Sequence, residues 1–412
     1  MKALVFSRHP ARYVAARAAG LLRPGGGAAR GPLELEDIAP PKLPGPGWEL
    51  IRPRLAGICG SDISTIDARS SRYFEPIVSF PFTPGHEVVA DDNLGHRVVI
   101  EPVLGCVARN IEPVCQHCAA GDLGRCVNVA FGDLEPGLQS GFCCDTGGGW
   151  SLAMAAHQSQ LHRVPDEVSD ESAVLVEPAA CAIHAALATK ATPTDKVVVI
   201  GSGTLGLLTT LALRHFTNPA AILSVARYPH QARMAASLGA DRVVTSTETR
   251  RAVRRFTGSM ALGRPEREGD PERLTGGADI VMDCVGSESS IREALAVVRP
   301  GGRVVLVGMP GVTNVDLTGL WHREIELVGA YAYGTEQVGS RQARTFDLAL
   351  ELAATTDLAN LVTTTYPLHH YVDAIQHAAS AGRRGAVKIA FDLRGERGRD
   401  SLATIESKDR PA

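Results

Sequence analysis

Two short segments early in the chain carry side chains that bind metal ions. The segment "AGICGSDIST" contains Cys59, Ser61 and Asp62, and the segment "FTPGHEVVA" contains His86 and Glu87. A catalytic zinc site takes three protein ligands of the thiolate, imidazole and carboxylate types and leaves a fourth position for water or substrate. A lone cysteine or histidine is more often a packing or surface residue. Only the two segments together, placed ahead of the glycine motif described below, indicate a zinc site.

A second group of candidate ligands is a cysteine cluster. The stretch "CVARNIEPVCQHCAAGDLGRC" holds Cys106, Cys115, Cys118 and Cys126, four of the chain's nine cysteines. In a reducing compartment, clustered cysteines are more often metal ligands or catalytic thiols than disulfides. The N-terminal "MKALVF" is too short for a signal-peptide core, and no run approaches the roughly 18 apolar residues of a membrane span. We therefore expect a cytoplasmic protein whose cysteine cluster binds metal.

A glycine motif indicates a dinucleotide cofactor. In "DKVVVIGSGTLGLLTTLAL", Gly201, Gly203 and Gly206 form G-x-G-x-x-G with Thr204 and Leu205, directly after a predicted strand and at the start of a predicted helix. The glycines allow a tight turn, close approach of the backbone to a pyrophosphate, and close packing of helix on strand. The amides at the helix N-terminus can then bind phosphate. The alternative is a glycine-rich turn without a ligand.

The end of the next predicted strand bears on the choice of cofactor. An acidic residue about twenty positions after the motif binds the ribose 2′-hydroxyl in NAD-dependent proteins. Here Ala226 and Arg227 occupy that region. A guanidinium can bind a 2′-phosphate bidentately, so Arg227 favours NADP over NAD. The alternative is that Arg227 stacks on adenine or faces solvent.

The elements that must position these residues fall into two regions. From residue 48 to about 163, short β-rich runs are broken by Gly and Pro, which predicts a β-rich region, and we expect short strands and loops over residues 20–50. From about residue 185, apolar strands alternate with helix-period segments, which predicts βαβ units on a parallel sheet. The charged segment 247–274 predicts an exposed helix and loop.

Length and composition are consistent with a globular protein of two domains. The 412 residues exceed the usual size of one domain. A net charge of -3 gives no reason to expect nucleic acid or an anionic membrane as a partner. We therefore expect a small-molecule ligand.

The motifs together resemble those of the zinc-dependent medium-chain alcohol and polyol dehydrogenases. The segments "GICGSD", "PGHE", the cysteine cluster, "VEPAACAIHA" and "GSGTLG" stand in that family's order, and the resemblance covers about residues 30–393. It implies an α/β protein in which a β-rich, GroES-like catalytic domain is joined to a doubly wound Rossmann domain. The expected parts are a catalytic domain over 1–184, a Rossmann domain over 185–329, a returning segment over 330–393 that completes the catalytic domain, and a disordered tail over 394–412.

The resemblance implies the ligands of a catalytic zinc ion. Cys59 and His86 match the first two ligands. Polyol-type members place a glutamate seven residues before a histidine as the third, and Glu177 stands seven before His184. Cys181 could instead be the thiolate of the alcohol type, but the spacing favours Glu177.

Other roles are implied around these ligands. Glu87 matches a carboxylate beside the metal that can also approach it, and Asp62 would hydrogen-bond His86 and set its tautomer. Ser61 matches the hydroxyl that takes the substrate proton, although Ser64 stands where many members continue the relay with a histidine. Lys388, in "GAVKIAF", matches a basic residue near the cofactor phosphates, with a solvent-facing lysine as the alternative.

The cysteine cluster matches the family's structural zinc site only in part. Cys115, Cys118 and Cys126 have the expected C-x₂-C-x₇-C spacing, but Glu112 stands at the position of the first cysteine. Either Cys106 still reaches the metal, or Glu112 binds it, or the site is lost. Thiolate is the usual fourth ligand of closed sites, which favours Cys106.

The resemblance implies a zinc-dependent oxidoreductase that transfers a hydride between a secondary or polyol-like alcohol and NAD(P). Zinc in such a site lowers the pKa of a bound alcohol. Family members are usually homodimers or homotetramers. Two alternatives stay open from the sequence. One is a zinc-independent quinone or enoyl reductase of the same superfamily, and the other is a non-catalytic, NADPH-binding redox sensor.

Overall fold

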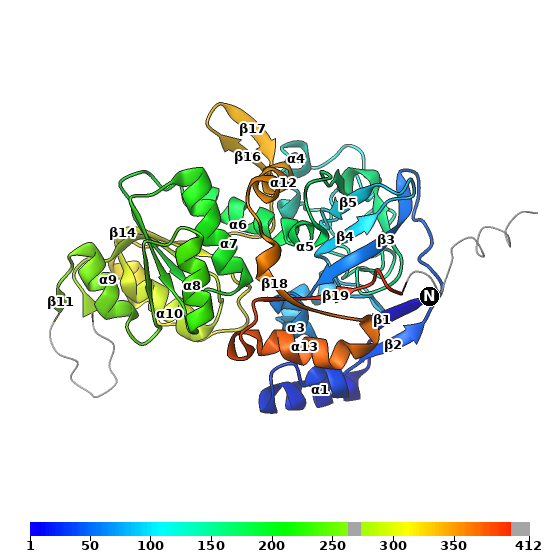
Figure 1. The fold of residues 1–412 in the computed structure, drawn as a ribbon, viewed down its shortest axis with the longest axis horizontal. Helices are drawn as coiled ribbons and strands as arrows, with labels where there is room; N and C mark the ends of the chain where they lie inside the picture. The colour runs from blue at the N-terminus through cyan, green and yellow to red at the C-terminus, as the bar shows by residue number, and fades with distance from the viewer. Residues whose placement is uncertain (263–272, 397–412) are drawn as a thin grey trace, which may run out of the picture.

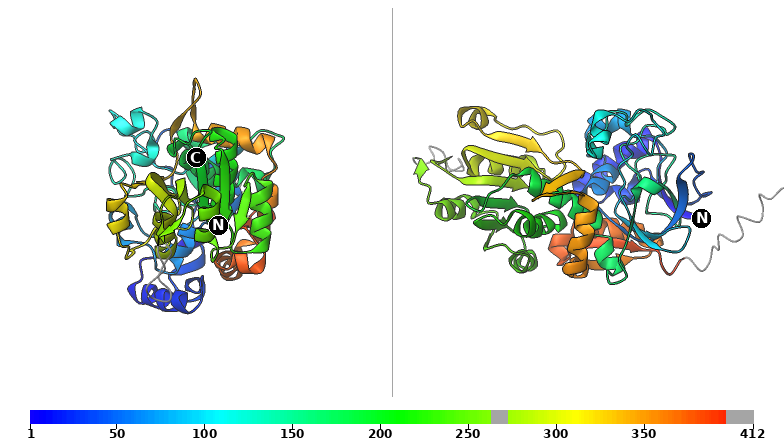
Figure 2. Two further views of the ribbon diagram at one scale, coloured as in Figure 1. Left: turned by 90° about the vertical axis from the view of Figure 1, so that its left-hand side faces the viewer. Right: turned by 90° about the horizontal axis from the view of Figure 1, so that it is seen from above.

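The computed structural model describes residues 1–262 and 273–396, and contains two extended sheets that lie side by side (Figures 1 and 2). The expected disordered tail falls outside the described residues from 397 on, as does part of the charged segment 247–274. Within the described ranges, none of the helices has the length and apolar character needed to cross a membrane.

One sheet is fully parallel, as the alternating pattern predicted. Its strands are, in spatial order, β10 (Arg242–Val244), β9 (Ala221–Val225), β8 (Lys196–Ile200), β13 (Ala278–Asp283), β14 (Val298–Leu306) and β15 (Glu326–Gly329). The order reverses direction beside β8, the strand that precedes the glycine motif. In doubly wound sheets, ligands bind at such a switch point, beyond the carboxyl ends of the strands.

Helices cover both faces of this sheet because its strands are apolar on both sides. Val197 and Val199 of β8 belong to one core cluster, and Val198 and Ile200 belong to another. The first face is covered by α7 (Thr204–Ala212) and α8 (Pro229–Ser237), with α6 (Val176–Ala188) packed against α7 and α12 (Thr345–Thr355) packed against α6. The second face is covered by α9 (Thr249–Thr257), α10 (Glu288–Val297) and α11 (Thr318–His322). This is a doubly wound arrangement.

The other sheet is mainly antiparallel and is built around a long central strand. In spatial order it runs β18 (Val362–Tyr366), β19 (Lys388–Asp392), β3 (Trp48–Gly57), β4 (Val88–Asp91), β5 (Arg97–Ile100) and β7 (Leu161–Arg163), and β6 (Met154–His157) also pairs with β3. The late strand β19 pairs with β3 through Ala390 and Gly57. The chain therefore returns to its first sheet after completing the parallel one.

Smaller elements lie around both sheets, and β11 lies beside α9 at the side of the parallel sheet (Figure 1). The hairpin of β16 and β17 projects from the molecule beside α12 (Figure 1). The strands are β1 (Lys2–Phe6) with β2 (Leu33–Asp37), β11 (Ala261–Leu262) with β12 (Arg273–Leu274), and β16 (Thr335–Val338) with β17 (Arg341–Arg344). The helices are α1 (Pro10–Leu22), α2 (Gly27–Arg30), α3 (Gly60–Ile66), α4 (Gln116–Ala119), α5 (Asp170–Ala173) and α13 (Tyr371–Ala379). Short 3₁₀ turns are η1 (Arg72–Ile77), η2 (Leu123–Arg125), η3 (Gln158–Gln160), η5 (Ala359–Leu361), η6 (Leu368–His370) and η7 (Ala381–Arg384), and η4 (Leu213–Thr217) is a π-helical end of α7.

The helix α1 was not predicted from the sequence. It begins at Pro10, whose missing amide hydrogen suits the first turn of a helix, and its last residues fall in the region expected to hold only strands and loops. The glycine-rich segment after it forms the short helix α2 before β2 begins. The two helices pack beside α3, which follows Cys59.

Candidate active site

Two of the expected zinc ligands, Cys59 and His86, lie together with Glu87, the carboxylate expected beside the metal. One ligand atom each of Cys59, His86 and Glu87 lies within 4.8 Å of the others. Cys59 is the N-cap of α3, and the other two residues precede β4. The turn before His86 requires glycine, because Gly85 has a φ of 100° and a Cβ there would collide with Trp150. The backbone therefore brings a thiol, an imidazole and a carboxylate to one point.

Asp62 orients two of these side chains. Its Oδ2 accepts a hydrogen bond of 2.8 Å from the amide of Cys59, and its Oδ1 lies 3.4 Å from Nδ1 of His86. Burial opposes the charged form of His86, but Asp62 and Cys59 outweigh it and hold the pKa of His86 well above its ordinary value. Since Nδ1 faces Asp62, Nε2 is the ring nitrogen left for a metal.

Lys388 departs from the sequence-based expectation. Its side chain is buried, at 3% exposure, and its ammonium forms an ion pair with Glu87. Burial lowers the pKa of Lys388, but Glu87 more than compensates and the net shift is upward. The solvent-facing alternative is therefore wrong, and the ammonium is directed at the metal-site carboxylate, so this arrangement gives no support to a contact with cofactor phosphates. A Cβ at Gly57 would collide with Glu87, so glycine in β3 makes room for the pair.

Glu177 enters the same region from the first turn of α6. Its carboxylate does not belong to the close group formed by Cys59, His86 and Glu87. It does interact electrostatically with His86, Glu87 and Lys388. Burial is the main cause that raises the pKa of Glu177 to about 7. The Cys181 thiol, one helical turn later, donates to Oε1 of Glu177 at 3.6 Å.

His184, which marked the Glu-x₆-His spacing, serves a different purpose. Its Nδ1 is hydrogen-bonded to the carboxylate of Glu336 in β16. The bond joins α6 to the projecting hairpin and does not reach the metal-binding group.

The residues present fit a divalent cation. Five buried side-chain polar atoms in the described residues lack a hydrogen bond of normal geometry, and three of them belong to Asp62, His86 and Glu87. Two of these atoms, Oδ1 of Asp62 and Nδ1 of His86, face each other at 3.4 Å, and Oε2 of Glu87 faces the Lys388 ammonium, so the fit to a cation rests on the chemistry of the donor set. The mixed thiolate, imidazole and carboxylate set suits zinc.

The cysteine cluster forms a second possible metal site. Ligand atoms of Cys106, Cys115, Cys118 and Cys126 all lie within 4.8 Å of one another. Backbone amides point at the sulfur atoms, from Cys115 to Cys106 at 3.4 Å and from Cys106 to Cys118 at 3.4 Å. The structure thus places Cys106, and not Glu112, with the other three. A closed set of four thiolates fits a structural zinc ion.

The glycine motif has the geometry that the sequence implied. Gly201 has a φ of 94°, and a Cβ at Gly206 would collide with the carbonyl oxygen of Gly201. Gly203 is the N-cap of α7, and a Cβ there would meet nothing within 4 Å, so the backbone is open to a ligand. Thr204 Oγ1 donates to the carbonyl of Val387 at 3.4 Å, which joins this turn to the residue before Lys388.

Comparison with known proteins decides the family. Residues 45–166 match the family model of the alcohol dehydrogenase GroES-like domain, and residues 204–355 match that of zinc-binding dehydrogenase. Over 378 residues the chain is 30% identical to L-idonate 5-dehydrogenase of Vitis vinifera, covering 88% of this chain and 92% of that protein. The chain belongs to the zinc-dependent medium-chain dehydrogenase family.

Other similar proteins support the same family assignment for this dehydrogenase. It is 28% identical over 372 residues to sorbitol dehydrogenase of Arabidopsis thaliana, covering 86% of this chain and 92% of that protein. The structure of galactitol-1-phosphate dehydrogenase from Escherichia coli has a TM-score of 0.68 at 17% identity, over 95% of this chain and 100% of that chain, which shows a shared fold. The expected family, fold class and reaction class, a zinc-dependent oxidoreductase acting on an alcohol with NAD(P), are thereby confirmed.

The residues directly after β9 include no carboxylate, although NAD-binding proteins carry one at this position. Arg227 follows β9 and is exposed, with its guanidinium carbon 5.7 Å from the ring centre of Tyr228. Leu205 is partly buried against the core that α7 shares with the parallel sheet.

Two features of the dehydrogenase site were missed by sequence reasoning. One is the Glu87–Lys388 pair, and the other is Tyr333, a buried residue whose hydroxyl lacks a hydrogen bond. Burial, followed by the nearby Glu177 and Cys181, raises the pKa of Tyr333 well above its ordinary value. Tyr333 follows the edge strand β15 and carries no motif, so only the fold could bring it to Glu177.

Proposed function

We propose that this dehydrogenase interconverts a secondary hydroxyl group of a polyol and the corresponding ketone, with a catalytic zinc ion and NADP. The observation that carries the proposal is the group of Cys59, which is partly exposed, with the buried His86 and Glu87, and Glu177 beside them. The relatives named for sorbitol and L-idonate support a polyol-like substrate.

The proposed zinc ligands are Cys59, His86 and Glu177. Glu87 is paired with Lys388, so its charge is already compensated. Within residues 1–262 and 273–396, the Cys181 thiol is the one hydrogen-bond partner of the Glu177 carboxylate, whose negative charge would complement zinc together with the Cys59 thiolate. When bound, zinc supplies Lewis-acid chemistry that lowers the pKa of the substrate hydroxyl.

Proton transfer is proposed to use Ser61. This residue lies in the first turn of α3, one position before Asp62, and is partly exposed. Ser64 carries no basic group, so Ser61 would exchange its proton with solvent rather than with a histidine. Asp62 meanwhile keeps His86 in a fixed orientation.

The preference for NADP is proposed from Arg227. The amides at the start of α7 would bind the pyrophosphate, and the exposed guanidinium after β9 would bind the 2′-phosphate. A homodimer or homotetramer is also expected. The exposed edge strand β15 supports it, since unpaired strand edges invite pairing. The cytoplasmic location stays a prediction.

The test joins metal analysis to a substrate screen. Wild-type protein, Cys59→Ala and the control Cys144→Ser are analysed for zinc and assayed on polyols and ketoses with NADP and NAD. We expect about two zinc ions per chain, polyol-dependent NADP reduction, and the loss of one zinc and of activity in Cys59→Ala. Cys144 donates to Asp145 and belongs to neither cysteine group, so Cys144→Ser should behave as wild type.

Each alternative predicts a different outcome. A zinc-independent reductase would retain activity in Cys59→Ala and would act on quinones or activated double bonds. A redox sensor would bind NADPH without turnover of any alcohol or carbonyl compound. Either result would overturn the proposal.

A further inference from the structure

Arg109 is a fully buried arginine inside the cysteine lobe, here defined as residues 104–137. Its side chain has 0% exposure. Among the described residues, its guanidinium is hydrogen-bonded only to backbone carbonyls. These carbonyls belong to Leu104 (3.1 Å), Phe131 (3.0 Å), Leu134 (3.1 Å), Glu135 (3.4 Å from both terminal nitrogens) and Gly137 (2.6 Å).

The position of Arg109 connects it to the metal-binding cysteines. It lies in the segment between Cys106 and Cys115, where the chain departs from the family's regular cysteine spacing. Its amide donates to the carbonyl of Cys106 at 3.1 Å, and its guanidinium binds carbonyls both before Cys106 and after Cys126. One side chain therefore joins the two ends of the lobe across the cysteine cluster.

The charges of the two groups complement each other. A divalent ion held by four thiolates leaves a net charge of about -2 on a site whose Cys106 and Cys126 are buried. A buried guanidinium bonded only to neutral carbonyls leaves a positive charge uncompensated, which is costly in a low dielectric. Arg109 interacts electrostatically with Cys126 and Cys106 of the cluster, and also with Cys143 and Asp145 outside it. Each charge therefore lowers the cost of burying the other.

We infer that Arg109 is a charge-balancing residue for a four-thiolate metal site in the cysteine lobe. Its hydrogen bonds stabilise the fold of the lobe around the displaced Cys106, whereas retention of the metal depends on its charge. Its charge favours the anionic, metal-loaded state of the cluster. This role is independent of the reaction proposed for the active site.

The simpler explanation is that Arg109 only satisfies carbonyls and stabilises the fold. The two explanations separate when charge and hydrogen bonding are changed independently. Arg109→Lys keeps the charge but loses the planar fork that reaches several carbonyls. Arg109→Gln keeps an amide donor but loses the charge.

The experiment follows release of zinc from full-length protein to an excess of a chromogenic chelator. A Cys59→Ser background restricts the measurement to the lobe. We expect Arg109→Gln to release zinc at least about tenfold faster, the scale of effect for residues that support metal ligands. Arg109→Lys should stay within about threefold of the parent while both variants unfold at lower temperature. The control Arg125→Gln, in the same lobe but exposed, should match the parent.

Equal release from the Lys and Gln variants, or release from the Gln variant at the parent rate, would overturn the inference. If Arg109→Gln is not recovered folded, Arg109→Met, which also removes the charge, replaces it in the comparison with Arg109→Lys. Near-parent zinc release from Arg109→Lys together with faster release from the neutral variant supports the charge role. Release at least about tenfold faster in Arg109→Lys contradicts it.

Discussion

At the scale of single residues, the proposed active site contains two carboxylates whose environments differ. Glu87 is paired with Lys388, whereas Glu177 accepts from a thiol and has a raised pKa because it is buried. We expect the Glu87–Lys388 pair to give the two carboxylates different roles, with Glu177 as the zinc ligand and Glu87 as the partner of the lysine. A carboxylate already neutralised by lysine is a poorer zinc ligand than one that gains its counter-charge from the metal.

Glutamine at each position tests this division. Glu177→Gln should lose the active-site zinc, about one ion per chain, with little change in the free energy of unfolding of the metal-free protein. Glu87→Gln should retain that zinc but leave the Lys388 ammonium buried without its partner, which costs about 3–5 kcal/mol. Metal analysis and urea unfolding with and without chelator measure both quantities. Zinc loss in Glu87→Gln together with zinc retention in Glu177→Gln would contradict this division and show that Glu87 is the zinc ligand.

The sequence predicted some of these residues and not others for a physical reason. Cys59 and His86 have side chains whose ordinary chemistry is metal binding, so residue type alone marks them as candidates. Lys388 is a common surface residue, and nothing near it in the chain shows that β19 brings it beside Glu87. The spacing left Cys106 and Glu112 as alternatives because loop length does not fix loop shape.

At the scale of elements, α3 is held in place by the unpredicted helices before β2. Asp67, the C-cap of α3, is fully buried and accepts from the amides of Gly25 at 2.9 Å and Gly27 at 3.0 Å. Arg17 in α1 donates to the carbonyl of Ala68 at 2.8 Å. The helix that positions Ser61 and its neighbours is thus fixed at its end by a carboxylate.

Asp67→Ala should lower the free energy of unfolding by about 3 kcal/mol. The substitution leaves two buried amides without their charged acceptor, and hydrogen bonds to charged groups contribute about 1.5–3 kcal/mol each. Urea denaturation measures the loss. Asp373→Ala in α13 is the control, because its side chain is 72% exposed and should change stability by less than about 0.5 kcal/mol. Equal stability of the two variants would show that α1 and α2 are not anchored through Asp67.

The parallel sheet could be predicted at this scale, but α1 could not. The strands of that sheet are buried on both faces and appear as apolar runs between helix-period segments. Helix α1 buries only Ala16 and Gly20. Two small residues do not form a recognisable apolar stripe of helical period, so the sequence pattern does not indicate a helix before the glycine-rich segment.

At the scale of the whole molecule, two adjacent residues connect the metal and cofactor regions. The carbonyl of Val387 accepts from Thr204 at the start of α7, and the next residue, Lys388, pairs with Glu87. A strand that returns to the first sheet late in the chain therefore touches both functional regions. No local pattern could predict this, because it depends on which strand β19 pairs with.

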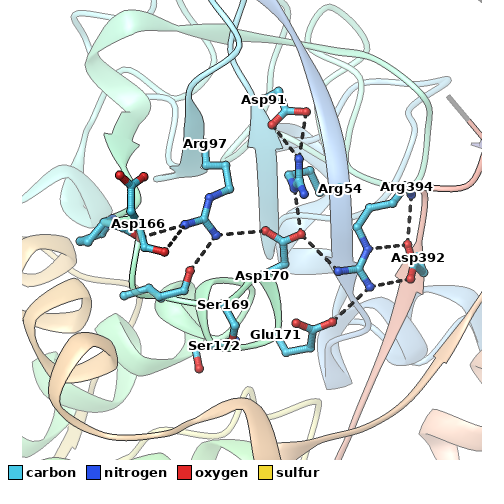
Figure 3. A network of polar contacts seen from close by, with 12 residues as sticks. Arg54, Asp91, Arg97, Asp166, Ser169, Asp170, Glu171, Ser172, Asp392 and Arg394 are labelled. Carbon is cyan, nitrogen blue, oxygen red and sulfur yellow. Dashed lines mark hydrogen bonds and ion pairs between the residues drawn. The ribbon is translucent and has the colours of Figure 1, made fainter. Parts of the chain in front are cut away.

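The buried carboxylate of Asp170 joins three segments of the mainly antiparallel sheet that are far apart in the sequence (Figure 3). Asp170 in α5 pairs with Arg54 of β3 at 2.8 Å, with Arg97 of β5 at 3.3 Å and with Arg394, beyond β19, at 3.2 Å. Arg394 also pairs with Asp392 at 2.7 Å. The network ties the returning end of the chain to strands formed much earlier in the sequence.

Asp170→Asn should therefore destabilise β3 and β19 as well as α5. We expect a loss of about 2 kcal/mol in the free energy of unfolding, below the 3–5 kcal/mol of a fully buried pair because the arginines are partly exposed. The matched control Glu171→Gln removes one exposed pair with Arg394 and should cost less than about 1 kcal/mol. Urea unfolding followed by fluorescence and by hydrogen exchange in β3 and β19 gives both the size and the location of the loss. If Asp170→Asn changed exchange only around α5, the carboxylate would be a local contact, and the returning strand would be held by its backbone pairing with β3 alone.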